Sequence, residues 1–226
     1  MVWVSLSQLV GPFYISDYCF FTGFCIILWL LFLLAALDST KRKAWIVTCA
    51  SSFVLTIFGS IQTWDIQVNN LWTNEYFYSE DNICRCVVIF FVASNFMDMI
   101  LGYAYYPEHV DPFTTIAHHI FYVIFMYFIL TLEFSRGFNI CFFMEAPTFL
   151  RAVGSIWPQY RYDLFFGVVF FLARIAFNVY LSYQLYFLAY PSIMWTSLAV
   201  LGLHIYWFTK WLFGFINKRS RTLKSQ

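Results

Sequence analysis

Charged residues are scarce in this chain of 226 residues: Asp, Glu, Lys and Arg together make up 11%, whereas hydrophobic residues make up 62%. A soluble domain is usually about a quarter charged and about half apolar. Apolar runs of about 20 residues, long enough to cross a bilayer as helices, recur along the whole sequence. The composition therefore excludes an ordinary soluble domain and predicts a polytopic membrane protein.

Three further scarcities exclude classes of function. The net charge of +1 offers no bulk attraction for nucleic acid, so we expect no nucleic-acid partner. The chain has four histidines, too few for the several histidine boxes of membrane di-iron desaturases and hydroxylases. Most of the six cysteines fall inside apolar runs, which argues against a disulfide framework.

The apolar runs predict an all-α fold of about seven transmembrane helices. Continuous apolar runs favour helices over alternating strands, and only helices or closed barrels satisfy the backbone in lipid. No Lys or Arg precedes the first apolar run, so we expect that run to remain as an anchor and not to be a cleaved signal peptide. The predicted helices span residues 18–37, 44–62, 84–106, 114–132, 138–153, 164–189 and 193–216.

Basic residues cluster in segments that a seven-helix chain places on one side of the membrane. These residues are Lys41, Arg42, Lys43, Arg161, Lys218, Arg219, Arg221 and Lys224. The loop at 63–82 has four acidic residues and no Lys or Arg. The positive-inside rule therefore predicts a cytosolic C-terminus and a lumenal N-terminus. Arg85 and Arg136 go against this pattern.

Polar and ionisable side chains recur in five of the predicted helices, although each costs a few kcal/mol to insert into a membrane. They are Asn95, Asp98, His118, His119, Glu145, Arg151, Arg174, Asn178 and His204. As a set they predict a polar chamber or relay inside the bundle. Individually they have a structural alternative, in which Glu145 or Asp98 pairs with Arg174 and histidines donate to backbone carbonyls.

The adjacent histidines, His118 and His119, point about 100° apart on a helix. One therefore faces the chamber while the other meets a neighbouring helix or the rim. A neutral imidazole is a general base or nucleophile near pH 7, and a nearby carboxylate fixes its tautomer. Fatty acyl transfer would suit such a site. A zinc ion bound by His118, His204 and a carboxylate is the alternative use of histidine, although we expect no metal.

Four short segments occur in the order found in a known family of membrane proteins. They are "SNFMDMI" with Asp98, "DPFTTIAHHI" with the histidine pair, "MEAPTFLR" with Glu145, and "FFLARIAFNVYL" with Arg174. In this series the chain resembles the TLC-domain family, which includes ceramide synthases, the translocating-chain-associated membrane protein and small TLC-domain-containing proteins. The resemblance implies an N-terminal segment with an anchor helix at 1–40, a six-helix TLC domain at 41–216 and a basic cytosolic tail at 217–226.

The resemblance also implies roles for individual residues. In ceramide synthases the paired histidines belong to the acyl-transfer site, and this carries over to His118 and His119. Met144 and Glu145 stand where those enzymes have a His-Asp motif, and the second aspartate of the motif is missing. The chain is therefore closer to the small TLC proteins, which are associated with membrane lipid composition, sphingolipid balance and trafficking from the endoplasmic reticulum.

Two hypotheses follow. The first is acyl transfer from acyl-CoA to a lipid amine or hydroxyl in the endoplasmic reticulum, with His118 as nucleophile or base and His119, Glu145 or Asp98 supporting it. Arg174, Asn178, Asn95 and His204 would bind the ligand. The second is a non-catalytic lipid-binding regulator of membrane composition or a trafficking factor.

Both hypotheses share the same partners. We expect membrane lipids as partners, acyl-CoA as a co-substrate and no tightly bound cofactor, and a homodimer stays open. A seven-helix receptor or transporter is a third class; the short loops and the lack of a detectable inverted repeat argue against it.

Overall fold

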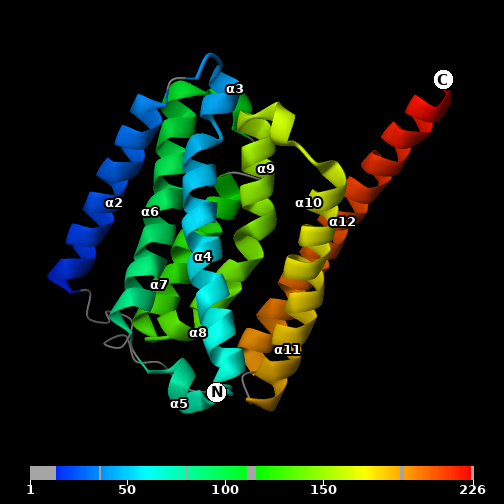
Figure 1. The fold of residues 1–226 in the computed structure, drawn as a ribbon. Helices are drawn as coiled ribbons and strands as arrows, with labels where there is room; N and C mark the ends of the chain where they lie inside the picture. Colours follow the sequence, from blue (N-terminus) through cyan, green and yellow to red (C-terminus); the bar gives the residue numbers. More distant parts are fainter. Residues whose placement is uncertain (1–13, 36, 80, 111–115, 189–190, 225–226) are drawn as a thin grey trace. The chain divides into compact units, whose positions relative to one another are not determined.

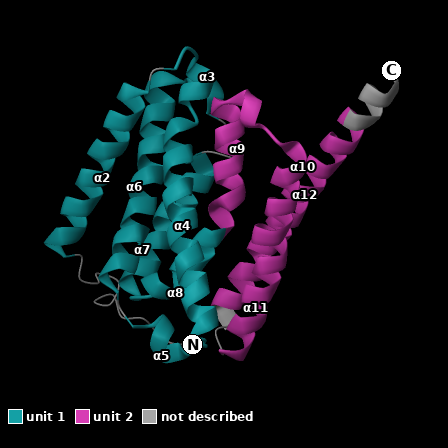
Figure 2. Cartoon of the chain, viewed as in Figure 1, with its two compact units in different colours: residues 1–143 teal, residues 144–226 magenta. Residues whose placement is uncertain are grey.

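The computed structural model describes residues 14–35, 37–79, 81–110, 116–188 and 191–224, and within them every regular element is helical (Figure 1). The all-α prediction is confirmed for this part of the chain. Two compact units follow one another along the chain, at Met1–Phe143 and Met144–Gln226 (Figure 2). The boundary between them falls inside the segment at 41–216 that was predicted as a single domain.

The first unit is built around one central helix. α6 packs against α2, α4, α7 and α8 and buries most of its residues, whereas α2 exposes most of its surface. The elements of this unit are α2 Ile15–Leu34, α3 Thr40–Lys43, α4 Ile46–Val68, α5 Asn74–Phe77, α6 Asn82–Tyr105, η1 Pro107–His109, α7 His118–Thr131 and α8 Ser135–Asn139, followed by the start of η3 Ile140–Glu145.

The long helices of this unit alternate in direction. α3 and the C-terminal ends of α2 and α6 lie at one end, and α5 and α8 lie at the other (Figure 1). The basic turn at 41–43 and the acidic loop at 63–82 therefore lie at opposite ends, as the charge pattern predicts.

In the second unit one long helix packs against a continuous helical run whose middle part is π-helical. α10, η5 and α11 follow each other without a break, and α12 packs against all three. Gly167 lies so close to the ring of Trp211 that a side chain at this position would collide with it. The elements are α9 Ala146–Ile156, η4 Pro158–Tyr160, α10 Asp163–Phe170, the π-helical η5 Phe171–Ala176, α11 Phe177–Phe187 and α12 Pro191–Lys224.

Five helical stretches are long and apolar enough to cross a membrane: Ile15–Leu34, Thr40–Val68, Asn82–Tyr105, Asp163–Phe187 and Ile193–Lys218. These properties are compatible with an integral membrane protein. The other two predicted spans are shorter in the structure, and the number seven stays a prediction. α7 has 14 residues from His118, and Thr114, where the predicted helix begins, lies outside the described residues.

The predicted helix at 138–153 is divided in the structure into α8, η3 and α9. Pro147 lies in the first turn of α9, where its missing backbone N–H leaves no helical hydrogen bond unmade. At the other end of this unit, α12 continues to Lys224. Much of the segment predicted as a tail at 217–226 is thus helical in the structure. The sequence is compatible with this, because residues 215–224 contain no glycine or proline.

Arg136, one of the two cations that go against the charge pattern, is bound by the acidic loop. Its Nη2 lies 2.7 Å from Asp81 Oδ2, its Nη1 donates to Ser79 Oγ at 2.7 Å, and its guanidinium lies over the Tyr76 ring. Asp81 also caps α6, because its Oδ1 accepts the backbone N–H groups of Ile83 and Cys84 at 2.8 and 2.9 Å. Asp81 neutralises the positive charge of Arg136. Arg136 therefore does not add an unbalanced cation to the acidic loop.

This ion pair gives a pH-dependent prediction. Burial alone would raise the pKa of the Asp81 carboxyl, but the Cys84 amide and the Arg136 guanidinium outweigh it and hold that pKa below its ordinary value. A carboxyl with a lowered folded pKa stabilises the protein above its unfolded pKa of about 3.9, and this contribution is lost as the pH falls through the folded pKa. Asp81→Asn keeps a capping oxygen but removes the charge. We expect it to destabilise the protein by up to about 1 kcal/mol near neutral pH.

The measurement is the unfolding of the purified protein in detergent, compared for wild type and Asp81→Asn between about pH 7 and about pH 2. The difference between them should shrink as the pH falls below about 4. Glu75→Gln is the control, because Glu75 is an exposed acid in the same loop and should show no such difference. A difference that is constant over the whole pH range would contradict the role assigned to the Asp81 charge.

Candidate functional site

Two neighbouring helices of the first unit bring a carboxylate and an imidazole together. α6 carries Asp98, α7 begins with the histidine pair, and the two helices pack against each other. His119 Nε2 lies 3.7 Å from Asp98 Oδ2, and the two side chains are 15% and 16% exposed. The pair is therefore largely withdrawn from solvent, yet part of each side chain can still be reached by a ligand.

A tyrosine completes this group. The Tyr106 hydroxyl donates to Asp98 Oδ1 at 3.3 Å, and the Tyr106 side chain is buried at the C-terminal end of α6. The two oxygens of the Asp98 carboxylate thus face a phenol and an imidazole. Tyr106 was not among the residues predicted from the sequence, and its position eight residues after Asp98 carried no signal of its own.

The free nitrogen of His119 defines the chemistry of the pair. Within the described residues, His119 Nδ1 is buried and has no hydrogen-bond partner. A proton on Nε2 would face the Asp98 carboxylate and leave the lone pair of Nδ1 to accept a proton or attack an electrophile. The 3.7 Å separation is longer than a hydrogen bond, and catalytic hydrogen bonds often tighten only when a substrate is bound. The pair has the parts of a base with an orienting carboxylate.

His118 is placed differently from its neighbour. Its ring packs edge-on against Tyr122 with the centroids 4.7 Å apart, and its centroid lies 5.6 Å from that of His119. The sequence analysis expected His118 as the nucleophile or base and His119 in support. The structure places the Asp98 carboxylate beside His119, which makes His119 the better candidate for the base. Asn95, on the same helix as Asp98, donates to the backbone carbonyl of Phe91 at 2.7 Å.

The predicted site residues of the second unit contact one another. Arg174 Nη2 lies 3.6 Å from Glu145 Oε1 and donates to Thr148 Oγ1 at 2.7 Å, while Nε donates to the Met144 carbonyl at 2.9 Å. Arg174 lies in the π-helical segment η5, and its carbonyl oxygen is 3.0 Å from His204 Nδ1. These contacts match the structural alternative, in which Glu145 pairs with Arg174 and a histidine binds a backbone carbonyl.

Asn178 belongs to a second polar contact of this unit. Its Oδ1 accepts Ser197 Oγ at 2.7 Å and Ser182 Oγ at 3.4 Å, which ties α11 to α12. Its Nδ2 is buried without a partner among the residues that the structure describes. Asn178 and Arg174 are thus mainly bound within their own unit.

A buried ion pair escaped the sequence analysis. Arg85 of α6 and Asp17 of α2 are each 5% exposed, and Arg85 Nη2 lies 2.7 Å from Asp17 Oδ2. The Nε of Arg85 also donates to both oxygens of Asp17, at 3.1 and 3.2 Å. Arg85 had been recognised as an exception to the charge pattern. That exception could have indicated an acidic partner, but the sequence analysis did not consider Asp17, which lies one residue before the first predicted helix and in the first turn of α2.

In the described part of the chain, no group of three or more His, Cys, Asp or Glu side chains is placed to hold a metal ion. No known family, curated protein or solved structure matches the chain. The resemblance to the TLC-domain family is neither supported nor contradicted by these comparisons, and it stays a hypothesis that rests on the residues quoted above.

Proposed function

We propose that this chain is a multi-pass protein of lipid homeostasis in the endoplasmic reticulum membrane, and that it transfers a fatty acyl group from acyl-CoA to a lipid amine or hydroxyl. The observation that carries the proposal is the proximity of His119 and Asp98, two titratable groups of apolar helices, with His119 Nδ1 buried and unbonded within the described residues. Such groups are costly in a membrane and are usually functional.

In the proposed mechanism His119 is the general base. It takes the proton from the acceptor amine or hydroxyl as that group attacks the thioester carbonyl of acyl-CoA, and Asp98 stabilises the imidazolium that forms. The tetrahedral intermediate then collapses, the carbon–sulfur bond breaks, and the proton passes from His119 to the leaving sulfur. The products are an acylated lipid and free CoA, so protons and electrons balance.

The proposed membrane orientation suits this reaction. Asp98 lies seven residues before Tyr105, the last residue of α6, which is about 10 Å along the helix. That end of α6 is the one which the positive-inside rule assigns to the cytosol, together with the C-terminus. A soluble acyl-CoA would then need to insert its thioester only a short distance. Seven spans and a lumenal N-terminus are part of this proposal.

The second candidate function is a non-catalytic lipid-binding regulator of membrane composition or a trafficking factor. The contacts of Glu145 favour it, because this carboxylate, predicted to assist a histidine, instead lies beside Arg174. The missing second aspartate of the ceramide-synthase motif favours it as well. In this reading the polar group around Asp98 orients a bound lipid and transfers nothing.

Comparative lipidomics distinguishes the two functions. Cells that lack the protein would be rescued with wild type or with His118→Ala/His119→Ala, with the expression of both verified. We expect only the wild type to restore a specific acylated lipid class. His109→Ala is the control, because His109 lies in η1, outside the apolar helices, and should rescue fully. Full rescue by the double variant would exclude acyl transfer by the histidines and leave the regulator.

A further inference from the structure

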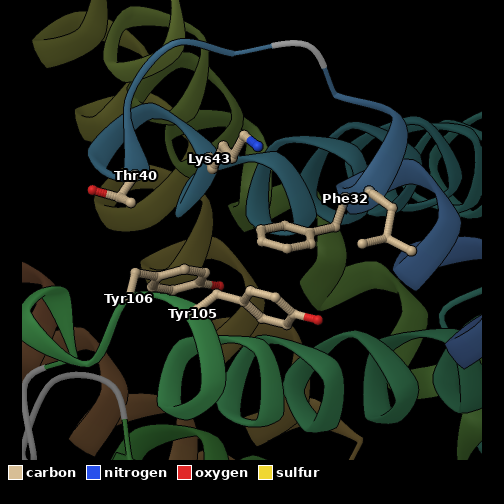
Figure 3. Close-up of a pocket in the computed structure, with 6 residues that line it drawn as sticks. Phe32, Thr40, Lys43, Tyr105 and Tyr106 are labelled. Atoms are coloured by element: carbon tan, nitrogen blue, oxygen red, sulfur yellow. The ribbon is translucent and has the colours of Figure 1, made fainter.

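A small pocket opens where two apolar helices of the first unit meet the basic turn (Figure 3). Its volume is about 180 Å³. Pockets for whole drug-sized ligands measure about 300–1,000 Å³, so this one has room for a headgroup and not for an entire lipid. It is lined by Phe32 and Leu33 of α2, Thr40 and Lys43 of α3, and Tyr105 and Tyr106 at the end of α6.

The walls of this pocket are aromatic. Phe32 is 4% exposed, and its ring centroid lies 5.2 Å from that of Tyr105 and 6.1 Å from that of Tyr106. Figure 3 shows the two tyrosines side by side, with Phe32, Thr40 and Lys43 around them. The three rings pack against one another at the pocket.

One positive charge in the lining has no counter-ion in the part of the chain that the structure describes. Among the described residues, the Lys43 ammonium has neither an ion pair nor a hydrogen bond, and the same holds for the hydroxyl groups of Thr40 and Tyr105. The neighbouring Arg42 differs, because its guanidinium is held by Asp38 at 2.7 Å. Arg42 and Asp38 therefore balance each other, whereas Lys43 contributes a cation and two hydroxyl donors lie in the same lining. This combination suits an anion with several acceptor oxygens.

The position of the pocket indicates where such an anion comes from. Two membrane-length helices, α2 and α6, end at it, and the basic turn of α3 adjoins it. Basic segments next to spanning helices attract the anionic lipids of the cytosolic leaflet. Leu33, which lines the pocket, and Leu34 beside it are exposed apolar side chains along which an acyl chain can lie. A lipid could therefore place its phosphate in the pocket while its chains stay in the bilayer.

We propose that this pocket binds the phosphate headgroup of an anionic phospholipid, with Lys43 as its counter-ion. The pocket also adjoins the candidate site, because Tyr106 lines it and donates to Asp98. A phosphate-bearing lipid held there is the acyl acceptor, and this last assignment rests on the proposed function. The lipid-binding step itself needs no catalysis.

The test is binding of a short-chain lysophosphatidic acid, which carries both a phosphate and a free hydroxyl, to the purified full-length protein in detergent, without acyl-CoA. Lys43→Gln should weaken binding by about tenfold or more, since hydrogen bonds to charged groups are among the stronger ones in proteins. Lys41→Gln is the matched control, because Lys41 is an exposed lysine on the same turn that does not line the pocket. It should bind as wild type does, and Lys43→Arg should retain most of the affinity. Monoacylglycerol with the same chain, which lacks the phosphate, should not distinguish Lys43→Gln from wild type.

Three results would overturn the proposal. They are unchanged binding by Lys43→Gln, an equal loss in Lys41→Gln, which would indicate attraction to the surface as a whole, and competition by inorganic phosphate as effective as that by the lipid. The proposed function is tested by a different experiment, the lipidomic rescue with the histidine variants, so its failure can be distinguished from that of the pocket. Lys43-dependent binding together with full rescue by the histidine variant would retain the pocket and remove acyl transfer.

Discussion

Replacing Arg85 with methionine is expected to destabilise the protein by about 3–5 kcal/mol, because it leaves the buried carboxylate of Asp17 without its counter-ion. The Tyr14 backbone N–H also donates to Asp17 Oδ2, at 3.0 Å, but it does not neutralise the charge. Asp17 is 5% exposed, and Arg85 contributes three contacts within 3.2 Å to its two oxygens. Arg85 Nη1 also donates to the Leu130 carbonyl of α7 at 3.4 Å. One side chain therefore links α2, α6 and α7, and its loss should weaken the packing of α2, which exposes most of its surface.

A double variant separates the charge from the packing. Asp17→Leu/Arg85→Met removes both charges, and replacing a buried ion pair with apolar residues is often neutral or stabilising. We expect it to recover most of the stability that Arg85→Met loses. Unfolding of the purified variants in detergent gives the free energies, and the double-mutant cycle gives the coupling between the two residues.

The matched control for this cycle is Arg161→Met. Arg161 forms an ion pair with Asp163 at 2.7 Å, but its side chain is 67% exposed. Exposed pairs contribute about 1 kcal/mol or less, so this variant should be nearly neutral. If Arg85→Met were as mild as Arg161→Met, or if the double variant were no better than the single one, the buried pair would not have the role inferred here.

The second large effect is expected at His119. In an acyl-transfer assay with the purified protein, His119→Gln should lower the rate by about 10²–10⁴, the usual contribution of a general base. Asp98→Asn should reduce the rate as well, because a neutral amide stabilises the imidazolium less than a carboxylate does. His118→Gln should cause a smaller loss, since its ring packs against Tyr122 while His119 faces Asp98.

The assay would follow transfer from labelled acyl-CoA to a lipid extract, and the three variants would first be compared for yield and thermal stability. Glutamine approximates the size of histidine and keeps a hydrogen-bonding group, so packing is largely preserved. A larger loss in His118→Gln than in His119→Gln would restore the assignment expected from the sequence. It would also show that the proximity of Asp98 to His119 is not what the reaction uses.

The approximate positions of the helices follow from the sequence alone. Within the described residues the predicted helices fall largely on helical structure, because long apolar runs without alternation leave the helix as the local way to pair backbone groups. The divided helix at 138–153 was less predictable. A 3₁₀ segment, η3, precedes Pro147 there, and nothing in the apolar pattern marks where an α-helix gives way to the tighter helix.

The candidate site was predictable in part. The sequence identifies His118, His119 and Asp98 as costly polar groups in apolar helices. Each is recognised from its residue type within an apolar run, without knowledge of its neighbours in space. The sequence does not reveal which of the two histidines faces the carboxylate, because the 100° step between neighbours allows either one to do so. Tyr106 was missed for a similar reason: one tyrosine among 16 carries no mark of its hydrogen bond to Asp98.

The sequence by itself determined the helical class, the apolar spans and the alternation of charge between loops, because these depend on local composition and on transfer between water and lipid. Only the tertiary structure decided which polar groups meet. Asp17 and Arg85 are 68 residues apart in the chain, and Arg174 is 30 residues from the Met144 carbonyl that it binds. Such pairs depend on how helices pack and in which direction each side chain points, and no local pattern in the sequence encodes that geometry.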